Sequence, residues 1–193
     1  NHAGILEDVS PVEGRDLPRQ RLWQIRAQEI VAAAGAHERP LVFAANDRPG
    51  IMLAHSALAY VARYGVSPGS RVVVATCGDA AYRVARDLLA AGVKVVALVD
   101  VRPQAQCPEA DGLRALGVEV LTGHTITGTE GRRRVCALHV SALNEIKKSR
   151  TIACDAIAMH GGWTPAVHLY SQARGKLRFA EALDAFVPAG DLA

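Results

Sequence analysis

Residues 71–100, RVVVATCGDAAYRVARDLLAAGVKVVALVD, decide the fold class of this chain. Residues 71–76 are a short segment with an apolar, largely β-branched centre, which is typical of a strand buried on both faces. The apolar side chains that follow recur at the spacing of one helix face: Ala81, Val84, Ala85, Leu88 and Leu89. Gly92 ends that helix, and residues 93–99 form a second buried strand. Strand, helix and strand in this order predict a right-handed crossover between two parallel strands.

The segments that follow extend this unit. A helix over about residues 105–116, closing at Gly117, and a strand over 118–121 give βαβαβ. After Gly123 come three strand-like segments separated by polar turns, at 124–129, 134–141 and 151–159. Such a pattern is typical of an antiparallel meander. The predicted fold class is therefore α/β, a Rossmann-like βαβαβ parallel sheet with an antiparallel β-meander.

The flanking regions predict only short elements. We expect strands at 22–26, 29–34, 176–179 and 184–187, a helix at 51–64, a connector at 37–50 and a turn at 161–165. The first 20 residues are turn-rich, and Asn1 is not an initiator methionine. We therefore interpret the chain as a piece of a longer protein.

Composition excludes several classes of protein. No apolar run approaches the roughly 20 residues that cross a bilayer, so no membrane span is expected. The net charge of +3 is too small to indicate a nucleic-acid partner, and residues 132–134 (RRR) follow a predicted hairpin tip that faces water. The four cysteines lie far apart without a C-x-x-C pair. They are expected to be reduced, mostly buried thiols of a cytoplasmic protein.

A glycine loop of the dinucleotide type follows the first strand of the βαβ unit. Small residues are needed there because the pyrophosphate and the helix must both approach the backbone closely. Residues 76–81, TCGDAA, keep the second glycine as Gly78 and place the acceptable Ala81 at the third position. Thr76 replaces the first glycine, and Asp79 puts a negative charge beside the phosphates. Two interpretations stay open, a nucleotide site or a Rossmann unit that no longer binds one.

Asp100 ends the second strand, about 20 residues after Gly78. An acidic residue at this place bonds the ribose diol of a bound dinucleotide and repels a 2′-phosphate, which favours NAD over NADP. Arg102 softens that preference. The alternative is a strand-end aspartate that only caps a turn.

The histidines predict neither catalysis nor metal binding. His37, Glu38 and Arg39 are consecutive, and neighbours in an extended chain point in opposite directions. A solvated or domain-interface role is therefore expected for them. No pair of histidines has the spacing of a zinc motif, and no G-x-S-x-G elbow is present, so metal and serine hydrolase chemistry are not expected.

Five motifs are more specific than the fold. They are AGAHERP at 34–40, NDRPGIM at 46–52, RYGV at 63–66, DAAYR at 79–83 and GGWTP at 161–165. With them, roughly residues 20–190 closely resemble a middle part of the alpha subunits of heterotetrameric sarcosine oxidases. Related subunits of hydrogen cyanide synthase and of opine-type amino acid dehydrogenases share several of these motifs.

This resemblance implies a two-dinucleotide-fold flavoprotein architecture similar to that of thioredoxin reductase. Residues 1–50 and 156–193 would be partial segments of the first nucleotide-type domain, and 51–155 the inserted second domain. Gly35 and Gly162 would mark the two crossings, and they join Gly78, Asp79, Ala81, Asp100 and Arg102 as predicted cofactor-binding residues. The cysteine pair of thioredoxin reductases is missing before the glycine loop, which excludes that activity.

The resemblance also implies a function. In this family the alpha subunit binds NAD, and the amine is oxidised at a flavin carried by the beta subunit, with FAD a further cofactor of the complex. The complex would demethylate sarcosine oxidatively to glycine, formaldehyde or methylene-folate, and peroxide. This chain would supply no catalytic residue, and its partners would be the other subunits. The alternative is a structural Rossmann module of a related amino acid dehydrogenase or hydrogen cyanide synthase subunit.

Overall fold

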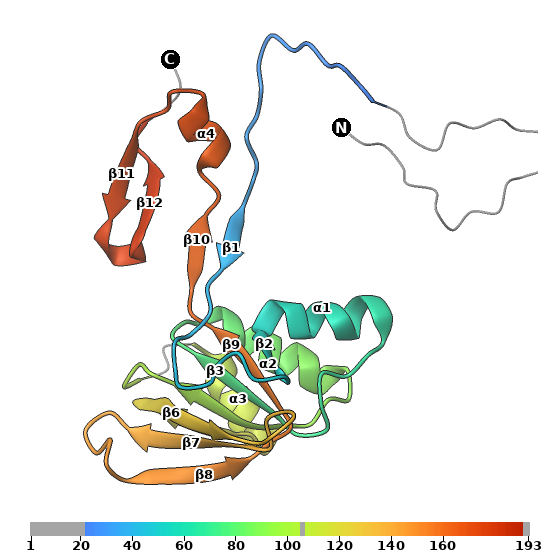
Figure 1. The fold of residues 1–193 in the computed structure, drawn as a ribbon, viewed down its shortest axis with the longest axis vertical. Helices are drawn as coiled ribbons and strands as arrows, with labels where there is room; N and C mark the ends of the chain where they lie inside the picture. Colours follow the sequence, from blue (N-terminus) through green and yellow to red (C-terminus); the bar gives the residue numbers. More distant parts are fainter. Residues whose placement is uncertain (1–21, 105–106, 191–193) are drawn as a thin grey trace, which may run out of the picture. The chain divides into compact units, whose positions relative to one another are not determined.

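The computed structural model describes residues 22–104 and 107–190. The chain divides into two units, Asn1–Ala33 and Ala34–Ala193, and every helix and strand described below belongs to the second (Figure 1). The strands expected at 22–26 and 29–34 are wrong, because residues 23–33 contain no strand. Their apolar side chains stay in water, with Ile30 86% and Val31 90% exposed. β-Branched residues alone do not make a strand without a surface to bury against.

A five-stranded parallel sheet forms the centre of the second unit, with strand order β2-β9-β3-β4-β5. Its strands are β2 (Ile51–Leu53), β3 (Val72–Thr76), β4 (Val95–Asp100), β5 (Glu119–Thr122) and β9 (Ala156–His160). Every residue of β3 and β9 is buried, as the almost entirely apolar sequences of these strands require. The βαβ unit and the α/β fold class are confirmed.

Three helices cover one face of this sheet (Figure 1). They are α1 (Ala54–Tyr64), α2 (Ala80–Ala90) and α3 (Glu109–Ala115). Leu88 of α2 and Leu113 of α3 pack with Val72, Val74 and Leu98 of the sheet. The helix expected at 51–64 begins three residues late, because residues 51–53 pair with β9 instead. The helix expected at about 105–116 is shorter, and residues 105–106 lie outside the described residues.

The predicted meander covers the opposite face of the sheet. Its strands are β6 (His124–Glu130), β7 (Ala137–Ala142) and β8 (Ser149–Ala153), in the order β6-β7-β8. Ile126, Leu138 and Val140 of the meander pack against Val73 and Ile157 of the sheet. The prediction of a single strand at 151–159 is wrong. The first strand ends at Ala153, and residues 156–160 enter the parallel sheet as β9.

The remaining elements are two pairs of strands and a short helix, and the first pair joins residues far apart in the sequence. β1 (Ala36–Glu38) pairs antiparallel with β10 (Trp163–Pro165), so the connector expected at 37–50 and the turn expected at 161–165 each contain a strand. Neither strand could be read from its own residues, because each exists only by pairing with the other. α4 (His168–Gln172) follows. The strands expected at 176–179 and 184–187 are confirmed as β11 (Leu177–Ala180) and β12 (Ala185–Pro188), which flank the 3₁₀ turn η1 (Glu181–Leu183).

The cysteines are all free, but Cys154 alone is fully buried, so the expectation of mostly buried thiols is wrong. Cys77 and Cys107 are half-buried and Cys136 is exposed, because they lie in loops around the sheet rather than in its strands. In the described residues, no helix is long and apolar enough to span a membrane.

Asp155 fastens the start of β9 to the segment that enters β3. Its carboxylate accepts hydrogen bonds from the Ser70 hydroxyl (2.6 Å), the Ser70 amide (3.0 Å) and the Arg71 amide (2.8 Å). Burial alone would raise the pKa of Asp155, but the bonds from Ser70 and Arg71 outweigh it and lower this pKa. Since the folded-state pKa lies below the unfolded one, this stabilisation is present above about pH 4 and is lost as the pH falls through the folded-state pKa.

We expect Asp155→Asn to lose about 1–2 kcal/mol of unfolding free energy at pH 7, because it weakens these hydrogen bonds. The difference from the unchanged protein should shrink at pH 3, which urea unfolding at the two pH values measures. Asp111→Asn is the matched control, because that carboxylate is exposed and forms a surface ion pair with Arg114. A gap between Asp155→Asn and the unchanged protein that is equal at both pH values would contradict the assignment.

Candidate functional site

The glycine loop lies at the carboxyl end of β3 and leads into α2. Inside it, the Thr76 hydroxyl donates to the Gly78 carbonyl oxygen (2.8 Å), and the Gly78 amide donates back to the Thr76 oxygen (2.9 Å). Thr76 is itself buried. The side chain that replaces the first glycine therefore takes up a backbone N–H that such loops offer to a phosphate.

Asp100 lies at the carboxyl end of β4 and is completely buried. Its carboxylate accepts a hydrogen bond from the Tyr82 hydroxyl (2.8 Å) and from the Arg102 amide (2.9 Å). The Arg102 guanidinium adds bonds of 3.1 Å to Oδ1 and 2.7 Å to Oδ2. Each carboxylate oxygen thus accepts at least two hydrogen bonds, which fills its capacity. A ribose diol could bond Asp100 only by displacing one of these donors.

Arg102 also links the glycine loop to the end of β4. Its guanidinium lies 2.7 Å from the Asp79 carboxylate, so it bridges Asp79 and Asp100. Asp79 occupies the N-cap position of α2 but makes no capping hydrogen bond with its side chain. The Asp79 carboxylate pairs with the Arg102 cation instead. Burial, followed by the hydrogen bond to Asp100, raises the pKa of Tyr82, which keeps its hydroxyl a donor.

The structure thus brings Gly78, Asp79, Ala81, Asp100 and Arg102 together at one edge of the sheet. The other two predicted residues, Gly35 and Gly162, directly precede β1 and β10. The Gly35 carbonyl accepts the Ala166 amide (2.9 Å), and the Gly162 carbonyl accepts the Arg39 amide (2.9 Å). Cofactor binding by these residues stays a prediction.

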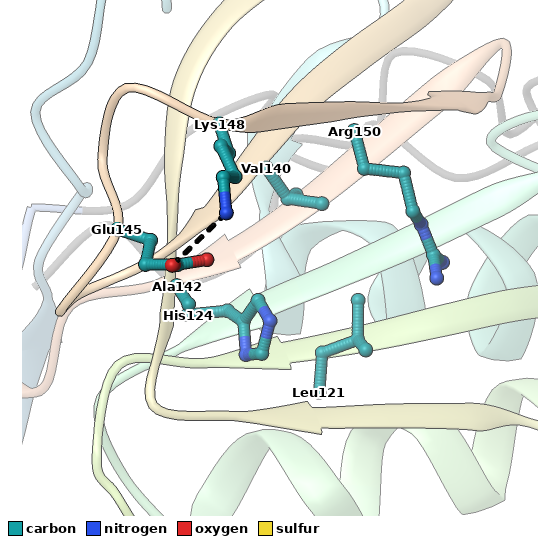
Figure 2. Close-up of a pocket in the computed structure, with 7 residues that line it drawn as sticks. All are labelled: Leu121, His124, Val140, Ala142, Glu145, Lys148 and Arg150. Carbon is teal, nitrogen blue, oxygen red and sulfur yellow. Dashed lines mark hydrogen bonds and ion pairs between the residues drawn. The ribbon is translucent and has the colours of Figure 1, made fainter.

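A cavity of about 90 Å³ opens near the same strand ends, between the sheet, residues 41–43 and the start of β6. It is far smaller than the roughly 300 Å³ at which ligand pockets begin. A second hollow of about 180 Å³ lies between β5 and the meander (Figure 2). Both cations that line it already pair with a carboxylate, Lys148 with Glu145 at 3.1 Å and Arg150 with Glu119. Neither hollow offers a prepared site for a nucleotide phosphate.

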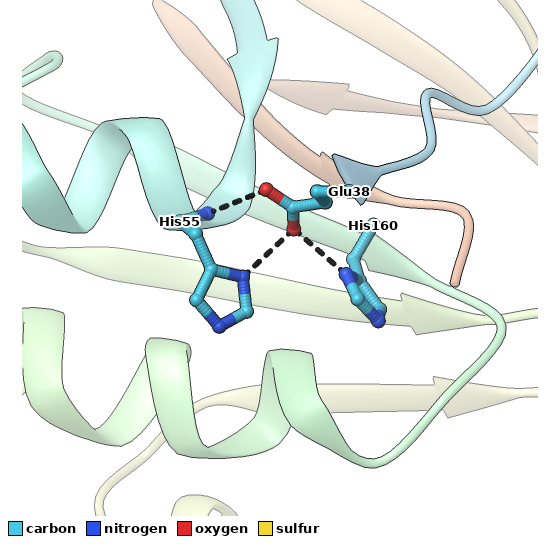
Figure 3. A group of neighbouring side chains, drawn as sticks. All are labelled: Glu38, His55 and His160. Carbon is cyan, nitrogen blue, oxygen red and sulfur yellow. Dashed lines mark hydrogen bonds and ion pairs between the residues drawn. The ribbon is translucent and has the colours of Figure 1, made fainter. Parts of the chain in front are cut away.

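A second group of polar side chains gathers where β1 meets the sheet (Figure 3). Glu38 comes from β1, His55 from the first turn of α1 and His160 from the end of β9. Glu38 Oε1 accepts a hydrogen bond from Nδ1 of His55 (2.9 Å) and from Nδ1 of His160 (2.7 Å), while Oε2 accepts the His55 amide (3.1 Å). Burial would raise the pKa of Glu38, but the bonds from His160 and His55 outweigh it and lower this pKa.

Sequence reasoning missed this group. The partners of Glu38 lie 17 and 122 residues away, so no motif spacing records them. The expected divergence of His37, Glu38 and Arg39 does hold, since the His37 ring faces His168 and Arg39 pairs with Asp184 (3.5 Å). Glu38 is nevertheless not solvated, because its side chain is only 5% exposed.

The fold is similar to that of several solved oxidoreductases. L-Proline dehydrogenase from P. horikoshii matches 82% of this chain and 26% of its own, with a TM-score of 0.57 and 23% identity. T. acidophilum thioredoxin reductase matches 75% of this chain and 47% of its own, with a TM-score of 0.60 and 14% identity. At these identities the likeness establishes the fold alone.

Sequence comparison narrows the class. The sarcosine oxidase alpha subunit of Corynebacterium sp. (strain P-1) is 43% identical over 180 residues, which cover 91% of this chain and 18% of that subunit. That of Rhizobium meliloti (strain 1021) is 42% identical, over 91% of this chain and 17% of the subunit. The chain is therefore a homologue of one segment of the sarcosine oxidase alpha subunits, and it spans about a fifth of their length. An opine oxidase subunit of Agrobacterium tumefaciens (strain Ach5) is a more distant relative at 25% identity, over 86% of this chain and 36% of its own length. No family model matches the chain.

Proposed function

We propose that this chain is a domain of an oxidoreductase subunit of the sarcosine oxidase type. The observation that carries the proposal is the 43% identity over 91% of the chain. The complex oxidatively demethylates sarcosine to glycine, formaldehyde or methylene-folate, and peroxide. It works in the cytoplasm with further subunits as partners, the intact alpha subunit binds NAD, and FAD is a second cofactor. This chain contributes no catalytic residue.

The proposed domain organisation keeps residues 51–155 as a second dinucleotide-type domain inserted between 1–50 and 156–193, with β9 at the start of the return segment pairing into the sheet of the inserted domain. The pairing of β1 with β10 supports it, because the chain enters and leaves through neighbouring antiparallel strands. Residues 1–21 and 191–193 of the flanking segments lie outside the described residues.

A second candidate role concerns the glycine loop and the neighbouring carboxyl ends of β3 and β4. The Thr76 hydroxyl oxygen accepts the hydrogen bond of the Gly78 amide, and Arg102 forms ion pairs with both Asp79 and Asp100. These contacts favour a structural Rossmann module that holds the shape of the subunit, with NAD bound on another loop of the intact subunit. The competing assignment is NAD bound at Gly78, Asp79, Ala81, Asp100 and Arg102, with Gly35 and Gly162 at the crossings.

Gly78→Ala separates the two roles. A Cβ at Gly78 would meet the His160 ring at 3.8 Å, an ordinary contact, so the fold tolerates the methyl group. A nucleotide held at this loop needs close approach to the backbone, and its affinity would fall about tenfold or more. We expect NAD titration of the intact subunit by calorimetry to give the same affinity with and without the substitution.

A weakened NAD affinity in Gly78→Ala, with an unchanged thermal unfolding temperature, would assign the ligand to this loop. Gly112→Ala is the control, because that glycine lies in α3 with open space around its Cβ position. Failure of the intact subunit to oxidise sarcosine, in the presence of its partners, would overturn the broader proposal.

A further inference from the structure

We propose that Glu38, His55 and His160 bind a zinc ion, with a fourth coordination position open to solvent. The inference goes beyond the proposed function and does not depend on it. The three side chains offer two imidazole nitrogens and one carboxylate oxygen, and these atoms all lie within 4.8 Å of one another. Two histidines and one carboxylate, with a fourth position left for water, form a recurring zinc ligand set.

The distances between the ligand atoms are slightly shorter than those around a bound zinc ion. Zinc lies about 2.0–2.2 Å from nitrogen and oxygen ligands, so neighbouring ligand atoms in a tetrahedral site are about 3.3 Å apart. Glu38 Oε1 lies 2.9 Å from Nδ1 of His55 and 2.7 Å from Nδ1 of His160. A shift of the carboxylate by about half an ångström brings both of these distances to the tetrahedral value.

The buried negative charge of Glu38 favours the binding of a cation. The Glu38 side chain is 5% exposed and the His160 side chain 2% exposed. Among the residues that the structure describes, no lysine or arginine forms an ion pair with Glu38. With neutral imidazoles, the cluster is a buried anion, and buried charges in proteins are paired or coordinate a metal. When zinc binds both Nδ1 atoms, each neutral imidazole carries its proton on Nε2.

The surroundings hold the ligands in place and leave one side accessible. The Trp163 ring centroid lies 4.8 Å from that of His55 and 5.3 Å from that of His160, so Trp163 packs against both imidazoles. The His55 side chain remains 39% exposed, which provides an entry path and room for a water ligand. His160 also borders the glycine loop at Gly78. Imidazole ligands favour zinc over magnesium or calcium, which prefer oxygen.

The test is a zinc titration of the intact subunit after removal of metal with a chelator. We expect calorimetry to show one more zinc ion bound per chain in the unchanged protein than in His55→Ala. The affinity of this site should fall about 100-fold or more when His55 is lost, since a third of its protein ligands is gone. His55 is the residue to replace because its partial exposure lets the fold tolerate alanine.

His37→Ala is the matched control, because it removes a neighbouring histidine whose ring contacts His168 rather than the cluster. It should bind zinc as the unchanged protein does. Cobalt(II) in place of zinc should give the visible absorption bands of a tetrahedral site, and His55→Ala should abolish them. Equal zinc stoichiometry and affinity in the unchanged protein and His55→Ala, or preferential binding of magnesium, would overturn the assignment.

Discussion

Replacing Asp100 by alanine is expected to lower the unfolding free energy of the protein by about 3 kcal/mol or more. The carboxylate is fully buried and accepts hydrogen bonds from the Tyr82 hydroxyl and from the backbone and guanidinium of Arg102. Alanine leaves the buried Tyr82 hydroxyl without its acceptor, and a buried donor without a partner costs about 1–3 kcal/mol by itself. Urea unfolding followed by circular dichroism measures the loss.

Tyr82→Phe is the matched variant for Asp100→Ala. It removes one hydroxyl, leaves the guanidinium bonds in place and should cost only about 1 kcal/mol. Arg102 keeps Asp79 as a partner in both variants. If Asp100→Ala were no more destabilised than Tyr82→Phe, the ion pair of Arg102 with Asp100 would contribute nothing to stability. That result would contradict the hypothesis that the side chains beside the glycine loop bind one another in place of a nucleotide.

Ile157→Ala is the second substitution with a large expected effect, a loss of about 2–5 kcal/mol. Ile157 is fully buried in β9, in the cluster of side chains between the parallel sheet and the meander. Alanine leaves a cavity at that interface, and the close-packed strands around it relax only partly. Thermal or urea unfolding should show the loss without a change in the secondary structure of the folded protein.

Ile157→Val removes a single methyl group and should cost only about 0.5–1.5 kcal/mol. Val42→Ala provides the exposed control, since Val42 is 94% exposed and its truncation should change the unfolding free energy by less than about 0.5 kcal/mol. Equal losses for Ile157→Ala and Val42→Ala would show that β9 does not carry the contact between the two layers.

The βαβ unit could be predicted from sequence because its signals are local. Four apolar residues of β3 follow one another, and the apolar stripe of α2 repeats every three to four residues. Residues 156–159 carry the same uninterrupted apolar signal, yet the sequence pattern joins them to the preceding meander strand. The pattern misleads there because periodicity shows that a strand is buried, but not which sheet it enters.

The candidate sites divide in the same way. The sequence by itself determined the fold class, the incomplete glycine loop and the resemblance to sarcosine oxidase alpha subunits, since these depend on residues close together along the chain. Tertiary structure alone decided that Arg102 occupies Asp79 and Asp100. It also decided that Glu38 meets His55 and His160, which lie 17 and 122 residues away. Contacts of that kind depend on how strands pair across the fold, and no local pattern of side chains encodes them.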